Sequence, residues 1–185
     1  MDWRAPADTW NHRWEYDKNP REFFRVLYQL ADEGLEFQVA LAGENSRQSP
    51  IEFEEARRRL GERVVHYGFA DDVETHVRVL RRADILPVTS RHNFSGVCAV
   101  EAMYCGAWPL LPARLTYPDF IPAAWEAECL YRTEGELVAR LRRLIQEAER
   151  HRADSLEAHV APYDWSRLAA AFDACFQGIV DGAAA

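Results

Sequence analysis

The chain has 185 residues, with 22 Lys and Arg against 30 Asp and Glu, which gives a formal net charge of −8. This length predicts one domain with a single core, and the acidic balance argues against a large basic nucleic-acid surface, although it leaves room for a local basic rim. A content of 48% hydrophobic and 28% charged residues is typical of an ordinary globular protein.

Targeting and redox signals are weak in this sequence. It contains no run of about 18 uncharged apolar residues flanked like a membrane span, and its start, "MDWRAPADTW", lacks the pattern of a signal peptide. We therefore expect a cytoplasmic protein. The four cysteines lack the CxxC spacing of a zinc site and the density of a disulfide scaffold, so we interpret them as reduced core thiols, three of them in apolar surroundings.

Strand and helix patterns alternate along the chain. The segment before Trp10, "APAD", stands where a first strand would be, although it is more polar than a buried first strand should be. A helix follows over residues 20–34, opened by a proline and closed by a glycine, with Phe23, Leu27 and Leu30 on one face.

The remaining elements are predicted as strands at 37–43, 63–69, 83–90, 108–112 and 128–132 and as helices at 50–60, 71–83, 96–105, 134–151 and 166–180. Pro87 does not fit comfortably into a central ladder position. Helices of about 10 to 15 residues between strands predict right-handed crossovers and a mainly parallel sheet covered on both faces. We therefore expect an α/β fold with a doubly wound, Rossmann-like sheet, and a disordered tail only at residues 183–185.

Two loops are predicted to form a ligand site. Doubly wound sheets bind ligands outside the carboxyl ends of their strands, where the strand order reverses, so the loops after the first and fourth strands should meet there. The first loop, "HRWEYDK", offers Arg13 and Lys18 but lacks the GxGxxG turn of a dinucleotide site. The other, "SRHNFSG", runs into a helix that starts near Gly96, and free N–H groups at a helix start favour an anion. Together the loops predict a diphosphate site.

One acidic residue, Glu101, interrupts the apolar run "FSGVCAVEAMYCGAWPLLP", which predicts a buried helix. A buried carboxylate without a partner is costly, so such a group is normally paired, protonated or functional. Glu101 lies five residues beyond Gly96, about 7 to 8 Å along a helix, and a ribose lies about that far from its diphosphate. Its carboxylate suits the 2′ and 3′ hydroxyls of a ribonucleotide. A solvated or ion-paired helix residue explains the same spacing equally well.

Several separated segments resemble retaining glycosyltransferases of the GT-B fold. Residues 101–109, "EAMYCGAWP", are similar to the second half of the nucleotide-sugar motif of that group, in which two glutamates flank seven residues at a helix start. "HRWEYDK" resembles its Arg and Lys pair for the donor diphosphate. Over about residues 10–145, "WNHRWEYDKNPREFF", "HYGF", "RRADILPVTSRHNFSGVCAVEAMYCG" and "LTYPDFIP" resemble more closely the tRNA-queuosine α-mannosyltransferase family.

The resemblance implies roles for the residues of both loops. Arg13 and Lys18 would neutralise the donor diphosphate and stabilise the leaving group, and Glu101 would hold the ribose. No metal ion or cofactor is implied. The other implied donor-site residues are Ser95, Gly96 and Val97 through their backbone N–H groups, Tyr67, Gly68 and Phe69 near the base, Gly43 and Glu44 at the border of the cleft, and the loop residues His92, Asn93 and Phe94.

The resemblance also implies what the chain lacks. Asn93 stands where the family has its first glutamate, which is expected to touch the transferred sugar, and it carries no charge. A GT-B enzyme also has an N-terminal acceptor domain, for which 185 residues leave no room. We therefore expect residues 1–185 to be a single nucleotide-sugar-binding domain that is weakly active or inactive alone. The implied donor is a GDP-sugar such as GDP-mannose, and the implied acceptor is queuosine in tRNA, bound mainly through the missing domain.

Other interpretations fit the same residues. Asn93 and the missing half also suit a non-catalytic nucleotide-sugar binding or interaction domain. A sugar-nucleotide epimerase would bind a similar donor, but it needs acid and base carboxylates that the cleft loops do not obviously supply. His12 and His92 border the predicted site or are structural. Five tryptophans are interpreted as packing anchors rather than sugar platforms: Trp10, Trp14, Trp108, Trp125 and Trp165.

Overall fold

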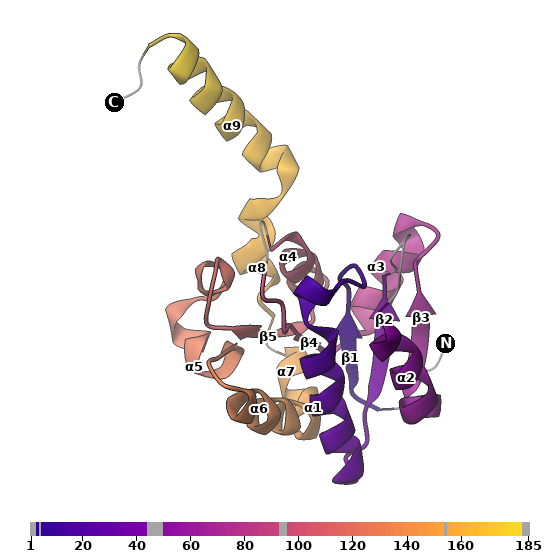
Figure 1. The fold of residues 1–185 in the computed structure, drawn as a ribbon. Helices are drawn as coiled ribbons and strands as arrows, with labels where there is room; N and C mark the ends of the chain where they lie inside the picture. Colours follow the sequence, from indigo (N-terminus) through magenta and orange to yellow (C-terminus); the bar gives the residue numbers. More distant parts are fainter. Residues whose placement is uncertain (1–2, 4, 44–49, 93–95, 154, 183–185) are drawn as a thin grey trace.

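The computed structural model describes residues 3, 5–43, 50–92, 96–153 and 155–182. Its strands form one parallel sheet in the order β3-β2-β1-β4-β5-β6 (Figure 1). The strands are β1 (Ala7–Trp10), β2 (Gln38–Ala42), β3 (Val64–Gly68), β4 (Ile85–Pro87), β5 (Trp108–Pro112) and β6 (Leu130–Tyr131). The predicted doubly wound α/β fold is therefore confirmed, and its strand order reverses between β1 and β4.

Helices cover both faces of this sheet (Figure 1). On one face α1 (Pro20–Asp32) packs against α2 (Ile51–Leu60) and α6 (Glu134–Gln146), and on the other α4 (Val97–Tyr104) contacts α3 (Val73–Arg82) and α8 (Glu157–Val160). The helix predicted over 134–151 is divided at Glu147 into α6 and α7 (Ala148–Ala153). The shorter elements are α5 (Glu126–Cys129) and the 3-10 turns η1 (Tyr16–Lys18), η2 (Gly61–Arg63), η3 (Tyr117–Phe120), η4 (Ala123–Trp125) and η5 (Ala161–Tyr163).

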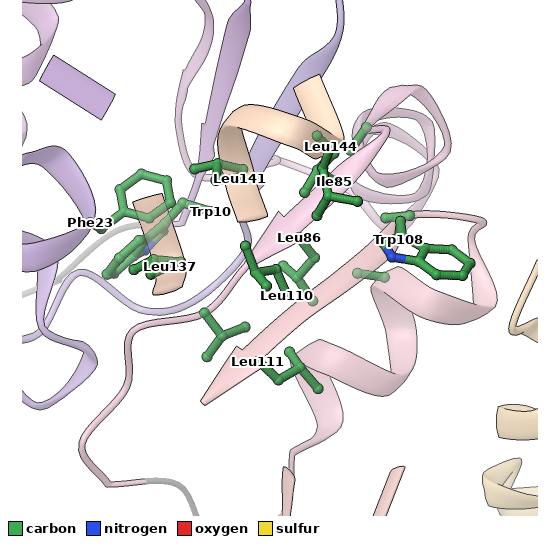
Figure 2. Packing of buried hydrophobic residues seen from close by; sticks show 14 of the residues in the cluster. Trp10, Phe23, Ile85, Leu86, Trp108, Leu110, Leu111, Leu137, Leu141 and Leu144 are labelled. Atoms are coloured by element: carbon green, nitrogen blue, oxygen red, sulfur yellow. The ribbon is translucent and has the colours of Figure 1, made fainter. Parts of the chain in front are cut away.

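Trp10, the last residue of β1, is a centre of the hydrophobic core. Its ring lies edge-on to Phe23 of α1, with centroids 4.9 Å apart, and to Phe53 of α2 at 5.4 Å. Leu137 and Leu141 of α6 belong to the same hydrophobic cluster (Figure 2). Aromatic side chains bury more apolar area than other residues, so this cluster fixes the strand whose carboxyl end opens into the predicted ligand site.

The expectation that Pro87 would not fit a central strand is wrong. Pro87 ends β4, which lies between β1 and β5, and it pairs with Leu110. The pairing of β4 with β1 is confined to Asp8 and Ile85, so the missing N–H of Pro87 breaks no bond of that ladder. The N–H of Val88 then donates to the carbonyl of Leu110 at 2.9 Å and continues the pairing with β5.

The cysteines are only partly in the core. All four are free thiols, but Cys129 alone is buried, while Cys98 and Cys105 are partly exposed and Cys175 is exposed. The expectation of core thiols is therefore wrong for three of them.

α9 (Trp165–Val180) extends away from the body of the molecule (Figure 1). None of its residues is buried, and Trp165, Phe172 and Phe176 are 68%, 47% and 62% exposed. Their rings follow one another along the helix at 5.7 and 6.4 Å and form an apolar stripe. Within the described ranges, no helix is both long and apolar enough to cross a membrane. Residues 183–185, the expected tail, lie outside those ranges.

Candidate functional site

A cleft of about 640 Å³ opens at the carboxyl ends of β1, β2 and β3. Its walls come from the loops after these strands and from the facing sides of α3 and α4. The lining residues are 11–13 and 15 after β1, Ala42 and Gly43 at the end of β2, residues 69–73 after β3, His76 of α3 and Glu101 of α4. The cleft therefore lies where a doubly wound sheet binds ligands.

Glu101 lies on the open side of α4. Its side chain is 50% exposed, whereas Ala99, Ala102 and Met103 on the other side of the same helix are buried. The premise that Glu101 is a buried charge is therefore wrong. His76 faces it from α3, with 3.8 Å between the imidazole Nε2 and the carboxylate Oε2. Because 3.8 Å is too long for a hydrogen bond, the carboxylate keeps its capacity to accept hydrogen bonds from a ligand.

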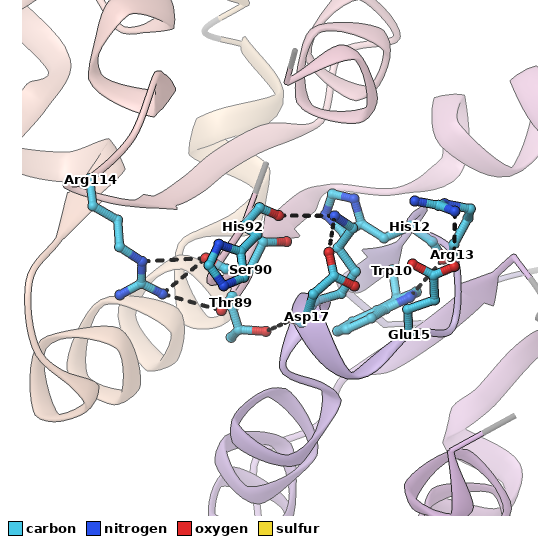
Figure 3. A network of polar contacts seen from close by, with 10 residues as sticks. Trp10, His12, Arg13, Glu15, Asp17, Thr89, Ser90, His92 and Arg114 are labelled. Carbon is cyan, nitrogen blue, oxygen red and sulfur yellow. Dashed lines mark hydrogen bonds and ion pairs between the residues drawn. The ribbon is translucent and has the colours of Figure 1, made fainter. Parts of the chain in front are cut away.

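Arg13 and Lys18 take different positions in the first loop. Arg13 lines the cleft with a side chain that is 71% exposed, and its Nη1 lies 2.9 Å from the Glu15 carboxylate. Lys18 is 13% exposed, and its Nζ donates to the Asp17 carboxylate at 2.7 Å and to the carbonyl of His92 at 2.9 Å (Figure 3). Arg13 therefore belongs to the cleft wall, and Lys18 lies where the two loops join.

The loops after β1 and β4 meet, as the strand order predicted. Thr89 donates its hydroxyl to the carbonyls of Lys18 and Asn19 at 2.9 and 3.1 Å, and the N–H of Arg91 donates to the carbonyl of Asp17 at 2.9 Å. These bonds, with that from Lys18 to His92, fix one loop against the other (Figure 3).

Two predicted glycines are required by close contacts within the protein. Gly96 precedes α4 with a φ of 66°, and a Cβ there would lie 2.2 Å from the ring of Phe120. Gly43 has a φ of 144°, and a Cβ there would lie 2.4 Å from the carbonyl oxygen of His12. Both conformations and both contacts favour glycine. The structure thus gives Gly96 a packing reason, in addition to the close backbone approach expected for a ligand.

Of the residues predicted to lie near the base, Phe69 lines the cleft and Tyr67 does not. Phe69 is 61% exposed. Tyr67 instead contacts α2, where its hydroxyl donates to Glu54 at 2.9 Å. Its ring also packs on Trp14 of the loop after β1, with 4.8 Å between the ring centroids. Burial, and then the Glu54 carboxylate, raise the pKa of Tyr67 to about 12. Tyr67 is therefore a neutral phenol at pH 7, and it lies outside the lining of the cleft.

His12, whose role the sequence left open, lies in the floor of the cleft and is 4% exposed. Burial, with a smaller contribution from Lys18, lowers its pKa to about 4, so the imidazole is neutral at pH 7. Its neighbour Asn11 donates from Nδ2 to the carbonyl of Cys98 at 2.7 Å and ties the end of β1 to the first turn of α4.

The sequence and the structure agree on part of this cleft. The structure brings Arg13, Gly43, Phe69 and Glu101 together with His12, while Lys18, Tyr67, Gly68, His92, Gly96 and Val97 lie outside its lining. Sequence reasoning missed Asn11, Glu15, Ala42, residues 70–73 and His76. The run "ADD" at the start of α3 carried a signal, because an exposed acidic turn follows a strand end there. Glu44, Asn93, Phe94 and Ser95 lie outside the described residues.

No group of three or more His, Cys, Asp or Glu side chains that could hold a metal ion occurs within the described ranges. The cleft offers instead one guanidinium, the imidazoles of His12 and His76, and several carboxylates. These groups suit an organic ligand that carries both an anionic part and hydroxyl groups.

Comparison with known sequences matches residues 11–159 to the family described as "Glycosyl transferases group 1". The tRNA-queuosine alpha-mannosyltransferase of Drosophila melanogaster is 37% identical over 132 residues, which are 71% of this chain and 34% of that protein. A GDP-mannose-dependent alpha-(1-6)-phosphatidylinositol dimannoside mannosyltransferase of Mycobacterium tuberculosis is 24% identical over 158 residues, 85% of this chain and 40% of that protein. The chain thus spans between a third and two fifths of the length of these relatives.

Comparison with solved structures gives the same fold. A sucrose-phosphate synthase from Thermosynechococcus elongatus superposes with a TM-score of 0.76 at 20% identity, over 98% of this chain and 47% of that one. The C-terminal domain of a glycosyl transferase group 1 family protein from Francisella tularensis superposes with a TM-score of 0.70 at 17% identity, over 87% of this chain and 86% of that domain. At these identities the likeness is one of fold.

Proposed function

Because the chain belongs to the glycosyl transferases of group 1, we propose that it binds a nucleoside diphosphate sugar in the cleft and is the donor-binding domain of a retaining transferase. One observation carries this proposal: Arg13 and Glu101 line a single cleft, one from the loop after β1 and the other from α4. The guanidinium suits phosphate oxygens and the carboxylate suits the vicinal hydroxyls of a ribose. The nucleotide then lies across the carboxyl ends of the strands.

Transfer breaks the bond between the anomeric carbon of the sugar and the diphosphate, and negative charge develops on the departing phosphate. Arg13 and Lys18 stabilise that charge in this proposal. Arg13 exchanges the Glu15 carboxylate, now 2.9 Å away, for the phosphate. Lys18 acts from the loop junction, where its ammonium is already held by two oxygens. We assign no protein nucleophile.

The relatives suggest the donor and the acceptor. The names of both include a mannosyl transfer, and that of the mycobacterial protein includes GDP-mannose, so we propose GDP-mannose as the donor. From the Drosophila relative we propose queuosine in tRNA as the acceptor, and hence a cytoplasmic site of action. Because the chain spans 34% of that relative and carries a net charge of −8, tRNA contacts are expected mainly from a further acceptor domain.

Titration calorimetry with GDP, GDP-mannose, UDP and ADP tests donor binding. We expect the guanine nucleotides to bind more tightly than the other two, and Arg13→Gln and Glu101→Gln to weaken GDP by about 10- to 100-fold, the usual value of a charge-assisted hydrogen bond. Arg58→Gln and Glu62→Gln are the matched controls, because both positions are exposed and lie outside the cleft. Absence of nucleotide binding at millimolar concentration, or equal binding by all variants, would overturn the proposal.

A second test concerns turnover. Donor hydrolysis by the chain is expected to be slow, and Asn93→Glu should raise it, because the substitution restores the carboxylate that the family motif places beside the transferred sugar. If GDP-mannose binds but Asn93→Glu leaves hydrolysis unchanged, the chain is better described as a nucleotide-sugar binding domain than as a weakened enzyme.

A further inference from the structure

Arg114, just beyond β5, makes contacts that no part of the proposed donor site accounts for. Its guanidinium donates to the carbonyl of Ser90 from Nε and Nη2, at 3.3 and 3.1 Å, and to the carbonyl of Thr89 from Nη2 at 3.2 Å. Both carbonyls belong to the stretch that leads from β4 into the loop before α4 (Figure 3). Two successive peptide groups of that loop are thus held by one side chain.

The same stretch is bonded from its other side by the loop after β1. The peptide that joins Ser90 to Arg91 has its oxygen on Arg114, while its N–H donates to the carbonyl of Asp17 at 2.9 Å. Because a trans peptide is planar and its C=O and N–H point in opposite directions, this one group bridges the loops after β1, β4 and β5. Loss of the bond on one side frees the plane to rotate and to break the bond on the other.

The segment after Arg114 also supports the far end of the β4 loop. Phe120, the last residue of η3, lies so close to Gly96 that a Cβ there would come within 2.2 Å of its ring. Between these two contacts Leu115 has a φ of 58°, a left-handed conformation that a non-glycine residue adopts rarely and at a cost. Residues 114–120 therefore contact both ends of the β4 loop, and the strained backbone at Leu115 joins the two contacts.

We propose that Arg114 is a positioning residue for the diphosphate. It holds the loop after β4 against the loop after β1, so that Lys18 and the start of α4 face the same phosphates. This inference rests on the proposed function of the cleft. The role assigned to Arg114 is indirect because three hydrogen bonds hold its guanidinium on the backbone carbonyls of Thr89 and Ser90.

The test compares nucleotides that differ by one phosphate. GMP and GDP are titrated into the unaltered chain, Arg114→Ala, Arg114→Lys and the charge control Arg58→Ala. If Arg114 positions the diphosphate site, Arg114→Ala should reduce the affinity gained from the second phosphate by about tenfold, with GMP binding and the melting temperature little changed. Arg114→Lys should restore only part of it, because an ammonium lacks the planar fork that reaches both carbonyls.

Two results overturn the inference while the proposed function survives. One is an unaltered preference for GDP in Arg114→Ala. The other is a loss of GMP and GDP affinity in equal proportion, which indicates a general structural role. If the unaltered chain binds neither nucleotide, the proposed function fails first and the inference fails with it.

Discussion

Each end of β1 has a buried titratable group near it, Asp8 at the amino end and His12 at the carboxyl end, and burial shifts their pKa values in opposite directions. Asp8, two residues before Trp10, is 0% exposed, and neither of its carboxyl oxygens has a hydrogen-bond partner among the described residues. Burial, and then the nearby Asp84 carboxylate, raise the pKa of Asp8 well above its usual range. His12, two residues after Trp10, is also buried, but its pKa is lowered. Desolvation is the main cause of both shifts, and of the two groups His12 lines the cleft.

The comparison shows that a buried titratable group can take part in a ligand site only where it also lines the cleft, as His12 does. At the amino end of β1 the carboxyl group has no cleft to face, and its desolvation makes folding less favourable. At the carboxyl end the imidazole lines the cleft and remains a neutral hydrogen-bonding group beside Lys18. The two groups also oppose each other in their dependence on pH, and variants can separate them.

The largest expected effect concerns His12. Its folded-state pKa of about 4 lies below the ordinary value of 6.5, so the shift leaves stability unchanged above pH 6.5 and lowers it as the pH falls toward 4, because only the unfolded chain then takes up the proton. The loss is about 3 kcal/mol of the free energy of unfolding. His12→Gln cannot take up this proton, so it should lose less stability than the unaltered chain on acidification. Urea unfolding at a series of pH values from 7.5 to 4.5 should show the difference between the two chains shifting in favour of the variant, and parallel curves would refute the assignment.

The second expected effect concerns Asp8, whose raised pKa makes the free energy of unfolding change with pH in the opposite direction. Because the pKa of Asp8 is raised in the folded state, stability is highest when the carboxyl is protonated and falls as the pH rises above the ordinary value. Asp8→Asn stays neutral, so it should be more stable than the unaltered chain at pH 7 by about 1–3 kcal/mol, with the advantage shrinking toward pH 4. Asp173→Asn in exposed α9 is the control and should change stability by less than about 0.5 kcal/mol. A destabilised Asp8→Asn at pH 7 would contradict this account.

The fold was predictable because most elements carry their own local signals. Apolar runs marked the strands other than β1, whose segment is more polar although it is buried, and Asp72 and Thr133 cap α3 and α6 through their side chains. Membership of the glycosyl transferases of group 1 and the GT-B fold of the solved relatives confirm the resemblance seen in separated segments. Pro87 was misjudged because the sequence does not show that the ladder with β1 ends before it.

The exposure of α4 was not predictable for a related reason. Its sequence is apolar on all sides, so the burial of one face could not be told from the burial of both. In the structure Glu101 lines the cleft, and Cys98 and Cys105 are partly exposed. That α4 forms a wall of the cleft is a long-range fact, and it corrects the premise of a buried carboxylate. His76 and residues 70–73 join the site by the same packing.

The smallest expected effect distinguishes the two ends of β1 by their response to ligand. Bound GDP should raise the pKa of His12 by less than about one unit, because its phosphates offset the field of Lys18 while burial, the larger cause of the shift, remains. The pKa of Asp8 should not move, since Asp84 and burial alone set it. NMR titration of the imidazole and carboxyl signals with and without GDP measures both.

Guanosine is the matched ligand for that titration, because it fills the nucleoside part of the cleft without bringing charge. It should leave both pKa values unchanged. A shift of His12 with guanosine as large as with GDP would mean that the ligand acts on the imidazole by excluding water rather than through its phosphates, and the diphosphate would then lie away from the loop junction. A shift at Asp8 with GDP would show that the two ends of β1 are coupled, and the contrast between them would not hold.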